Sequence, residues 1–512
     1  MNYDRRRQES LSDLVLNSNY LLLIYPEIDQ LSCPTASSVR RARPAMPPNN
    51  HTTSPKTIEK AASTRTIPIQ KPVNQICQVI EENEDGTLVD PLCVPGNPVK
   101  VTFADITSAS FKVKNGIVNT PCVRSHLSSL TGMEIFLKKD FLQFTGSFKE
   151  RGACYALRML SEAQKSKGVT SASLGNHALA LCYHGKLLNI PVTVVMPKVA
   201  PIMKIQACRS HGATVVVEGK NMKEAKQISM RLAKEKGFTY INGYDHPHII
   251  AGQGTLGLEI LEQIKDIDAI IVPTGGGGLI AGVALAAKTL HPGIQIIGVE
   301  SDRCPSFSKA LEQGKPTEVP IYSTLADGLA VPLVGYNAFA TAAPLIDKMV
   351  VVKEEWIAIA ILRLVELEKC VVEGAGASGL AAILAGLLDD LKGKRVVIPL
   401  CGGNIDTTIL GRCLERGLAV DGRLLKFCVT VSDRPGGIAD LCQLVSRTGV
   451  SIKDIMHERA WITSDVFSVQ VTVVCETMDK EHTNQLKKVL TESYKSVAFG
   501  DEMNPWTMKL ID

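Results

Sequence analysis

The sequence lacks the features that mark membrane, metal-binding or nucleic-acid-binding proteins. No apolar run approaches the roughly 20 residues that a helix needs to cross a bilayer, and the YLLLIY cluster at 20–25 is far too short. The 14 cysteines form no CxxC pair and no metal-ligand spacing, so free, buried thiols in a reducing compartment are the simpler interpretation. A formal net charge of +4 over 512 residues gives no reason to expect a nucleic-acid partner.

The N-terminal part of the chain has too little apolar periodicity to fold. Residues 33–75 are rich in Ser, Thr, Pro and Arg, and Glu59 is their only acidic residue. Such a segment cannot bury enough surface to offset its ordering entropy. We therefore predict that residues 1–95 form a disordered extension.

The first residues of the chain give an indication of the cellular compartment. The basic triplet at 5–7 would suit a mitochondrial transit peptide, but Asp4, Glu9 and Asp13 argue against one because such peptides avoid acidic residues. The cytoplasm is therefore the expected compartment, with the mitochondrion second.

Residues 96–420 alternate short apolar strands with amphipathic helices. The predicted strands are rich in Val and Ile and apolar on both faces, as strands covered by helices on each side should be; they span 191–196, 213–217, 269–272, 294–299 and 395–400. Helices are predicted at 223–236 and 252–264. This order predicts an α/β fold with a doubly wound, mostly parallel sheet.

The pattern changes at 421–512. A strand at 426–431 leads through the turn at 432–437 into a helix that ends near 445. Strands at 451–456 and 466–474, a helix at 480–492 and a last strand at 496–499 follow. This order is typical of a ferredoxin-like α+β unit, and we predict a separate regulatory domain.

Lys149 directly follows Phe148, which in turn follows a polar turn, in the segment TGSFKERG at 145–152. A lysine that forms a Schiff base must be rigid and partly desolvated, because burial disfavours its charged form. Taken alone, Lys149 would be read as a solvated surface residue and Phe148 as ordinary core. Arg151 is expected to be an ion-pair partner rather than a catalyst.

The segment SLGNHA at 173–178 opens a predicted helix. A helix N-terminus presents unpaired N–H groups and is suited to an amino-acid carboxylate. Asn176 could also reach a ring hydroxyl. A plain N-cap is the simpler alternative, and no proton-transfer role is assigned to His177.

Four glycines at 275–278 follow the predicted strand at 269–272 and precede a helix. Consecutive glycines let the backbone curl and direct N–H groups at a phosphate. The same stretch, with Gly276, Gly278 and Ala281, also fits a dinucleotide fingerprint, and Glu300 stands where a ribose-binding acid would. A nicotinamide enzyme therefore remains an alternative.

Cys401 ends the predicted strand at 395–400 and is followed by Gly402, Gly403 and Asn404. Ligands of such sheets lie at the carboxyl ends of the strands. A thiol at this place could hydrogen-bond a pyridine nitrogen without holding it protonated, since its ordinary pKa is about 8.5. A buried core cysteine is the alternative.

Taken together, these segments resemble the serine/threonine dehydratase family of fold-type II (tryptophan synthase β-like) pyridoxal-phosphate enzymes. Six ordered motifs carry the resemblance: GSFKERGA at 146–153, SLGNHA at 173–178, AGQGT at 251–255, GGGGL at 275–279, ADGLAV at 326–331 and CGGN at 401–404. The segment SDRPGGIADL at 432–441 is similar to an ACT domain. One ACT-like unit after such a core resembles the threonine dehydratases that have a single ACT domain, and implies a core of two subdomains.

The resemblance implies a role for each site residue. Lys149 would be the Schiff-base lysine, and cofactor contacts would also come from Phe148, Asn176, Gly275, Gly276, Gly277, Gly278, Leu279 and Cys401. The substrate carboxylate would be held by Ser173, Asn176 and His177.

The sequence departs from the family pattern at Leu174. Family members usually carry a small residue there, and the related serine racemases carry a serine that acts as a second base. Leucine cannot do so, and its bulk would crowd the carboxylate loop. In the racemase pattern a divalent metal lies near the strand of Glu300; here Ser306 replaces a later acidic position, so no metal is expected.

The resemblance implies a lyase that converts L-threonine to 2-oxobutanoate and ammonia, and L-serine to pyruvate, by α,β-elimination through an aminoacrylate. It also implies an amino-acid effector at the ACT-like domain and a homodimer or homotetramer. The alternatives are a serine racemase, which would form D-serine, a catalytically weak amino-acid sensor, and a dehydrogenase, which would bind NAD.

Overall fold

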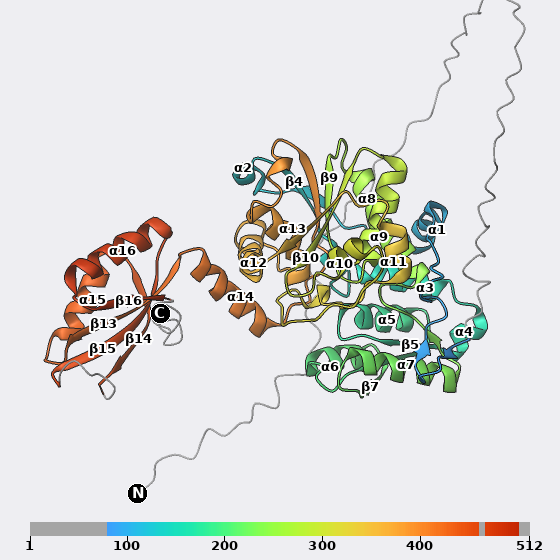
Figure 1. Cartoon of the computed structure of the whole chain (residues 1–512), viewed down its shortest axis with the longest axis horizontal. Coiled ribbons are helices and arrows are strands. Elements are labelled where there is room, and N and C mark those ends of the chain that lie inside the picture. Colours follow the sequence, from blue (N-terminus) through green and yellow to red (C-terminus); the bar gives the residue numbers. More distant parts are fainter. Residues whose placement is uncertain (1–78, 460–465, 501–512) are drawn as a thin grey trace, which may run out of the picture. The chain divides into compact units, whose positions relative to one another are not determined.

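The computed structural model describes residues 79–459 and 466–500 (Figure 1). The predictions for residues 1–78 lie outside the described residues. Within the described part of the chain, no helix is long and apolar enough to cross a membrane.

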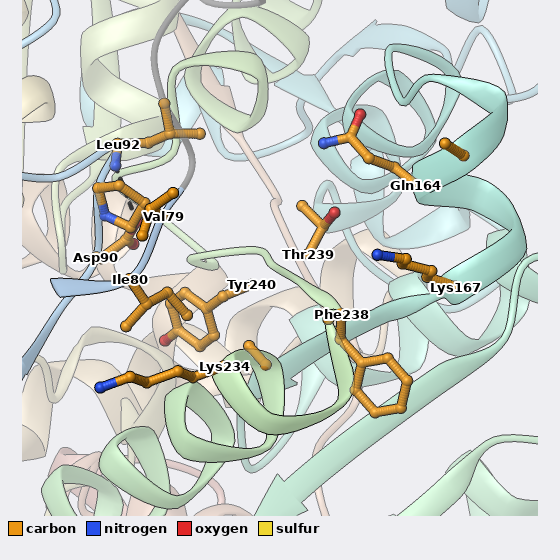
Figure 2. Close-up of a pocket in the computed structure, with 14 residues that line it drawn as sticks. Val79, Ile80, Asp90, Leu92, Gln164, Lys167, Lys234, Phe238, Thr239 and Tyr240 are labelled. Atoms are coloured by element: carbon orange, nitrogen blue, oxygen red, sulfur yellow. Dashed lines mark hydrogen bonds between the residues drawn. The ribbon is translucent and has the colours of Figure 1, made fainter.

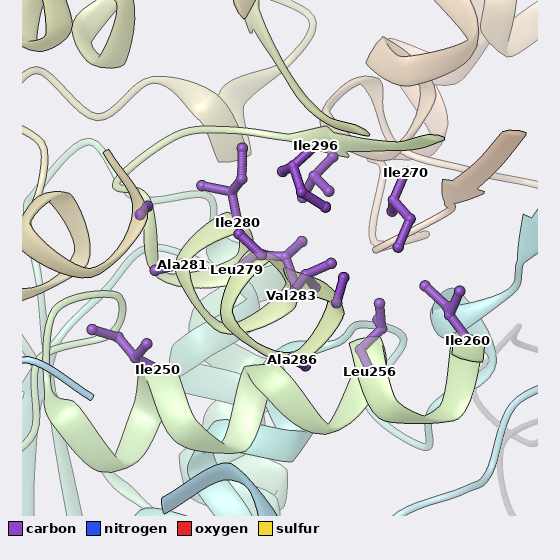
Figure 3. Packing of buried hydrophobic residues seen from close by; sticks show 14 of the residues in the cluster. Ile250, Leu256, Ile260, Ile270, Leu279, Ile280, Ala281, Val283, Ala286 and Ile296 are labelled. Carbon is purple, nitrogen blue, oxygen red and sulfur yellow. The ribbon is translucent and has the colours of Figure 1, made fainter. Parts of the chain in front are cut away.

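The larger sheet of the core has six strands and is parallel except for β3, at one edge. In spatial order its strands are β11 (Lys348–Val352), β10 (Gln295–Ser301), β9 (Ala269–Pro273), β12 (Arg395–Pro399), β4 (Glu134–Lys138) and β3 (Cys122–Arg124). Helices cover both faces, so successive residues of one strand enter different clusters. Ile270 packs with α8 (Pro247–Gln263) and α9 (Gly278–Leu290), as Figure 3 shows, while Ile271 packs with α12 (Glu354–Glu368) and α13 (Gly374–Leu384).

The smaller sheet has four parallel strands, in the order β7 (Thr214–Val217), β6 (Val192–Met196), β5 (Val169–Ala172) and β8 (Thr239–Tyr240). Its flanking helices include α3 (Lys149–Arg158), α5 (Asn176–Leu187), α6 (Ile202–Ser210) and α7 (Met222–Lys236). In α7 the Asn221 side chain accepts a hydrogen bond from the Glu224 N–H at 2.9 Å, and Gly237 ends the helix with φ 70°. These two residues fix the ends of α7.

The remaining helices of the core complete its layers. They are α1 (Phe103–Val113), α2 (Ser128–Thr131), α4 (Glu162–Lys167), α10 (Ser306–Gln313), α11 (Tyr336–Ala342) and α14 (Thr407–Val420), with short 3₁₀ turns at Asp140–Leu142, Asp327–Leu329 and Asp389–Leu391.

The predicted α/β class with parallel sheets is confirmed, and the five predicted strands correspond to β6, β7, β9, β10 and β12. The strands β3, β4, β5, β8 and β11 were not predicted. β4 has the sequence EIFLK and contains Lys138, whose side chain is fully buried. Its ammonium is paired with Glu259 at 2.6 Å, a partner 121 residues away that the sequence pattern does not reveal.

The disordered extension predicted for residues 1–95 is wrong for its last part. β1 (Glu81–Glu82) and β2 (Leu88–Val89) form a hairpin, and Ile80 and Leu88 pack against Met230 of α7 and Tyr240 of β8. The Asn337 amide also donates a hydrogen bond to the Leu92 carbonyl at 2.6 Å. This segment folds on contacts with distant residues rather than on a local pattern.

The C-terminal α+β domain has the predicted order of elements. Its antiparallel sheet runs β14 (Ser451–Glu458), β15 (Ser468–Glu476), β13 (Leu424–Ser432) and β16 (Val497–Phe499). α15 (Gly437–Arg447) and α16 (Lys480–Ser493) share one hydrophobic cluster with alternate residues of β13 and β15, such as Phe427 and Val471. Both helices therefore cover the same face of this sheet.

Candidate active site

Lys149 is the first residue of α3, and its amine is held by the backbone. Nζ donates a hydrogen bond to the carbonyl of Gly243 at 2.6 Å and lies 5.1 Å from the centre of the Phe148 ring. Burial lowers the pKa of Lys149 to about 8, although the negative charge of Glu373 opposes the shift. A larger share of this amine is therefore neutral near physiological pH than of an ordinary lysine.

The four glycines at 275–278, here called the glycine loop, join β9 to α9 and pack against Tyr244, the residue after Gly243. A Cβ on Gly276 would lie 2.5 Å from the Tyr244 ring, and one on Gly278 would lie 2.3 Å from the Tyr244 carbonyl oxygen. Gly277 has φ 91°, which favours glycine. One short segment thus contacts the lysine amine through Gly243 and the glycine loop through Tyr244.

The N–H groups of this loop are available to an anion. Among the described residues, the backbone N–H groups of Gly275–Leu279 donate no hydrogen bond to another protein group. They lie at the start of a 13-residue helix, where the helix dipole is positive. The arrangement can bind a phosphate.

Leu279 takes part in a different way from the other predicted cofactor residues. Its side chain is 6% exposed and belongs to the hydrophobic cluster drawn in Figure 3, together with Ile280 and Val283. Only its backbone N–H, in the first turn of α9, is left for a ligand.

The segment CGGN at 401–404 is joined to the turn that carries Lys149. The Phe148 N–H donates to the Cys401 carbonyl at 2.9 Å, and the Gly403 N–H donates to the Gly146 carbonyl at 2.9 Å. Cys401 is 2% exposed, and burial raises the pKa of its thiol. Cys401 therefore stays a neutral thiol.

Asn176, the first residue of α5, is held at both ends of its amide. Its Nδ2 donates to Glu373 at 2.7 Å, and its Oδ1 accepts from Asn404 at 2.9 Å. Glu373 precedes α13. Burial is the main cause that raises its pKa to about 7, and the charge of Asp327 adds to the shift. The lysine turn, α5, α13 and the CGGN segment thus meet at one place.

The predicted carboxylate residues lie at the start of α5. The Ser173 hydroxyl oxygen accepts from the N–H groups of Gly175 at 3.4 Å and Ala178 at 3.3 Å, so it acts as a helix cap. His177 is 4% exposed, and burial, followed by the charge of Lys149, lowers its pKa to about 3. Its ring is neutral, and neither ring nitrogen has a hydrogen-bond partner among the described residues.

Two charged residues lie outside the chemistry of the site. Arg151 is fully buried and pairs with Asp140 and Glu259, each at 2.7 Å, as the ion-pair interpretation predicted. Glu300 accepts hydrogen bonds from the N–H groups of Phe307 at 2.6 Å and Ser308 at 2.8 Å, so it caps α10 and is not free for a ribose. No cluster of three or more potential metal ligands occurs in the described ranges.

The sequence analysis missed several site residues, because only the fold brings them next to the motifs. Glu373 and Tyr244 stand in no motif that was singled out, and Lys204 of α6 pairs with Asp327 at 3.1 Å. A Cβ on Gly175 would lie 3.5 Å from the Lys204 amine, which puts a positive charge beside the predicted carboxylate loop. The nearest signal in the sequence was Asp327, within the ADGLAV motif.

A hollow of about 400 Å³ lies elsewhere, between the N-terminal hairpin segment, α4 and α7 (Figure 2). It is lined by Ile80, Leu92, Lys167, Lys234 and Phe238, among others, and contains none of the site residues around Lys149. This hollow is therefore separate from the site around Lys149.

Comparison with known proteins decides the family. Residues 113–402, more than half of the chain, match the family model described as pyridoxal-phosphate dependent enzyme. The chain belongs to this family. Residues 428–491 match the ACT domain model, which confirms the predicted type of the C-terminal domain.

Individual relatives show which members of this family the chain resembles. The chain is 40% identical over 391 residues to an L-threonine ammonia-lyase of Thermotoga maritima, covering 76% of this chain and 97% of that protein. It is 42% identical over 324 residues to the catabolic L-threonine dehydratase TdcB of Staphylococcus aureus, covering 62% and 94%. It is therefore a homologue of threonine ammonia-lyases.

Solved structures agree on the fold. The processed threonine deaminase isoform 2 of Solanum lycopersicum matches with TM-score 0.59 and 35% identity over 63% of this chain and 96% of that one. Serine racemase of Dictyostelium discoideum matches with TM-score 0.57 and 36% identity over 60% and 100%.

The residues present fit the family's cofactor, pyridoxal phosphate. Lys149 supplies a partly neutral amine, the loop at 275–279 supplies unpaired N–H donors, and Cys401 supplies a neutral thiol.

Proposed function

We propose that this protein is an L-threonine ammonia-lyase that produces 2-oxobutanoate and ammonia, with L-serine as a second substrate that yields pyruvate. The observation that carries the proposal is the amine of Lys149, bound to the Gly243 carbonyl next to the segment that packs on the glycine loop. Homology to threonine ammonia-lyases over 97% of one relative supports the choice of substrate.

The residues that would hold pyridoxal phosphate are Lys149 through its amine, Gly275–Leu279 through their N–H groups, and Asn176, Phe148 and Cys401 around the ring. When bound, the cofactor withdraws electrons from the substrate Cα and so acidifies its proton. Because the Cys401 thiol is neutral and a weak acid, it would offer the ring nitrogen a hydrogen bond without charge, which would favour rapid loss of a β substituent.

Lys149 is the proposed base. Its lowered pKa leaves part of the amine population able to accept the proton from Cα. The hydroxyl of threonine then leaves Cβ as water, and the released unsaturated amine hydrolyses to 2-oxobutanoate and ammonia. Elimination releases one water molecule and hydrolysis consumes one, so threonine yields only 2-oxobutanoate and ammonia overall.

The substrate carboxylate is proposed to bind at the start of α5, through Ser173 and the N–H groups of Asn176 and His177. Among the described residues, these two N–H groups donate to no other protein group. The Lys204 amine adds a positive charge nearby. His177 contributes its backbone N–H rather than its neutral ring.

Keto acid formation tests the proposal. Purified protein loaded with pyridoxal phosphate is given L-threonine or L-serine, and 2-oxobutanoate, pyruvate and D-serine are measured by chromatography. We expect both keto acids from the wild type, none from Lys149→Ala, and unchanged rates from Lys315→Ala, which alters an exposed lysine. Formation of D-serine without keto acid would replace the lyase by a racemase.

We further propose that the C-terminal domain binds an amino-acid effector and that the chain forms a homodimer or homotetramer. The ACT match supports the first part. Rates measured with each of the common amino acids added, and mass measured by light scattering, test both. Rates that no amino acid alters would contradict regulation through this domain.

A further inference from the structure

The side chain of Asn404 lies between the lysine turn and Asn176. Its Nδ2 donates to the Thr145 carbonyl at 2.7 Å and to Asn176 Oδ1 at 2.9 Å, so both of its N–H bonds are used. Gly146 makes this approach possible, because a Cβ there would lie 2.4 Å from Asn404 Oδ1. The Asn404 amide is thus confined on two sides.

These hydrogen bonds have only one consistent direction. A backbone carbonyl can only accept, so Thr145 requires the amide nitrogen of Asn404 to face it. The second N–H of that nitrogen then requires an acceptor, which fixes Oδ1 of Asn176 toward Asn404. The Nδ2 of Asn176 must therefore face Glu373, whose carboxylate accepts at 2.7 Å.

We propose that Asn404 is a positioning residue that fixes the orientation of the Asn176 amide, so that Asn176 presents N–H donors to Glu373 and to the cofactor. This inference rests on the proposed role of Asn176 at the cofactor. The chain of bonds runs from Thr145, in the turn of Lys149, to Glu373 before α13. It links the lysine turn to the residue that precedes α13.

Asn404→Asp preserves the shape of the side chain but replaces its two N–H donors by an acceptor. Aspartate oxygens would face the acceptors Thr145 O and Asn176 Oδ1, so the Asn176 amide must turn over and present Oδ1 to Glu373. Two acceptors then meet unless Glu373 can donate. Glu373→Gln supplies that donor, so the double variant Asn404→Asp/Glu373→Gln relieves the conflict between Asn176 and residue 373, whereas the conflict between the introduced carboxylate and the Thr145 carbonyl remains.

The experiment is a titration of the cofactor-free protein with pyridoxal phosphate at pH 8, above the pKa of about 7 of Glu373. Absorbance at this pH gives the dissociation constant, and spectra of the loaded protein over a range of pH give the pH dependence of the bound band. We expect binding weaker by about tenfold or more for Asn404→Asp, a smaller loss for Asn404→Ala, and partial recovery in the double variant. Asn221→Asp is the matched control, because Asn221 acts only as an acceptor in the α7 cap.

The outcomes separate the possibilities. Wild-type affinity for Asn404→Asp, or a double variant whose loss equals the product of the two single losses, would overturn the proposal. If Asn404→Asp does not fold, an unchanged affinity and band for Asn404→Ala overturns it equally. Wild-type affinity of Asn176→Ala for pyridoxal phosphate would instead reject the role of Asn176 at the cofactor. A wild-type protein that binds the cofactor but forms no keto acid would reject only the proposed function.

Discussion

At the scale of single residues, burial moves the ionisable groups of the site toward their neutral forms. It lowers the pKa of Lys149 to about 8, raises that of Glu373 to about 7 and raises that of Cys401. The common cause is the loss of water around a charge, which neighbouring charges offset only in part. The chemistry of these groups is thus a property of the fold as much as of the residue type.

The amine of Lys149 is expected to react at a lower pH than ordinary lysines. In the cofactor-free protein, a reagent that attacks neutral amines should modify Lys149 with a rate that rises through about pH 8 and levels off above it. The sign follows because a lowered pKa leaves the neutral form dominant above pH 8. Mass spectrometry of the Lys149 peptide beside that of Lys315 checks this, and identical profiles for the two lysines would contradict it.

Residue types were predictable from sequence where a motif carried them, as for Lys149, Asn176 and Cys401. Their partners were not. Glu373 is 197 residues from Asn176, and the Asn404 bond spans 228 residues. Only the folded chain brings these side chains together.

At the scale of elements, the glycine loop owes its shape to Tyr244 as well as to its own flexibility. Gly276 and Gly278 both lie too close to Tyr244 for a side chain. Strands such as β9 and β12 were predictable because helices cover both their faces, which makes their sequences apolar almost throughout. β5 and β4 escaped because buried polar groups, such as Ser171 and Lys138, interrupt their apolar patterns.

Gly278→Ala should weaken cofactor binding and lower stability. The added methyl group would lie 2.3 Å from the Tyr244 carbonyl oxygen, so the loop or the segment that holds the Lys149 amine must shift. We expect a loss of about 1–3 kcal/mol in the free energy of unfolding, as for overpacked sites, and weaker pyridoxal phosphate binding. Denaturant unfolding and cofactor titration measure these effects.

Gly293→Ala is the control for that variant, because a Cβ added at Gly293 would have no neighbouring atom within 4 Å. Equal effects of the two substitutions would show that the loop does not depend on its contact with Tyr244.

At the scale of the whole molecule, the described chain contains separate hydrophobic clusters. The C-terminal domain has its own, built from β13, β15, α15 and α16. Its ferredoxin-like order was readable because short-range alternation and turns define each element. The hairpin at 81–89 was not, since its apolar residues gain partners only from α7 and β8.

Phe427→Ala should therefore destabilise the C-terminal domain selectively. Phe427 is fully buried in that cluster, and such a truncation costs about 3–5 kcal/mol. Hydrogen exchange should accelerate in β13 and β15 while β9 and β12 keep their protection. Met478→Ala, at a 75% exposed position, should change neither, and equal acceleration in both sheets would contradict separate cores.

The most direct test of the account is the visible absorbance of the purified protein with pyridoxal phosphate, wild type beside Lys149→Ala, before and after L-threonine. We predict a band that requires Lys149, that changes on adding L-threonine and that is accompanied by 2-oxobutanoate. A wild-type protein that cannot be loaded with the cofactor, or a band identical in Lys149→Ala, would contradict the account.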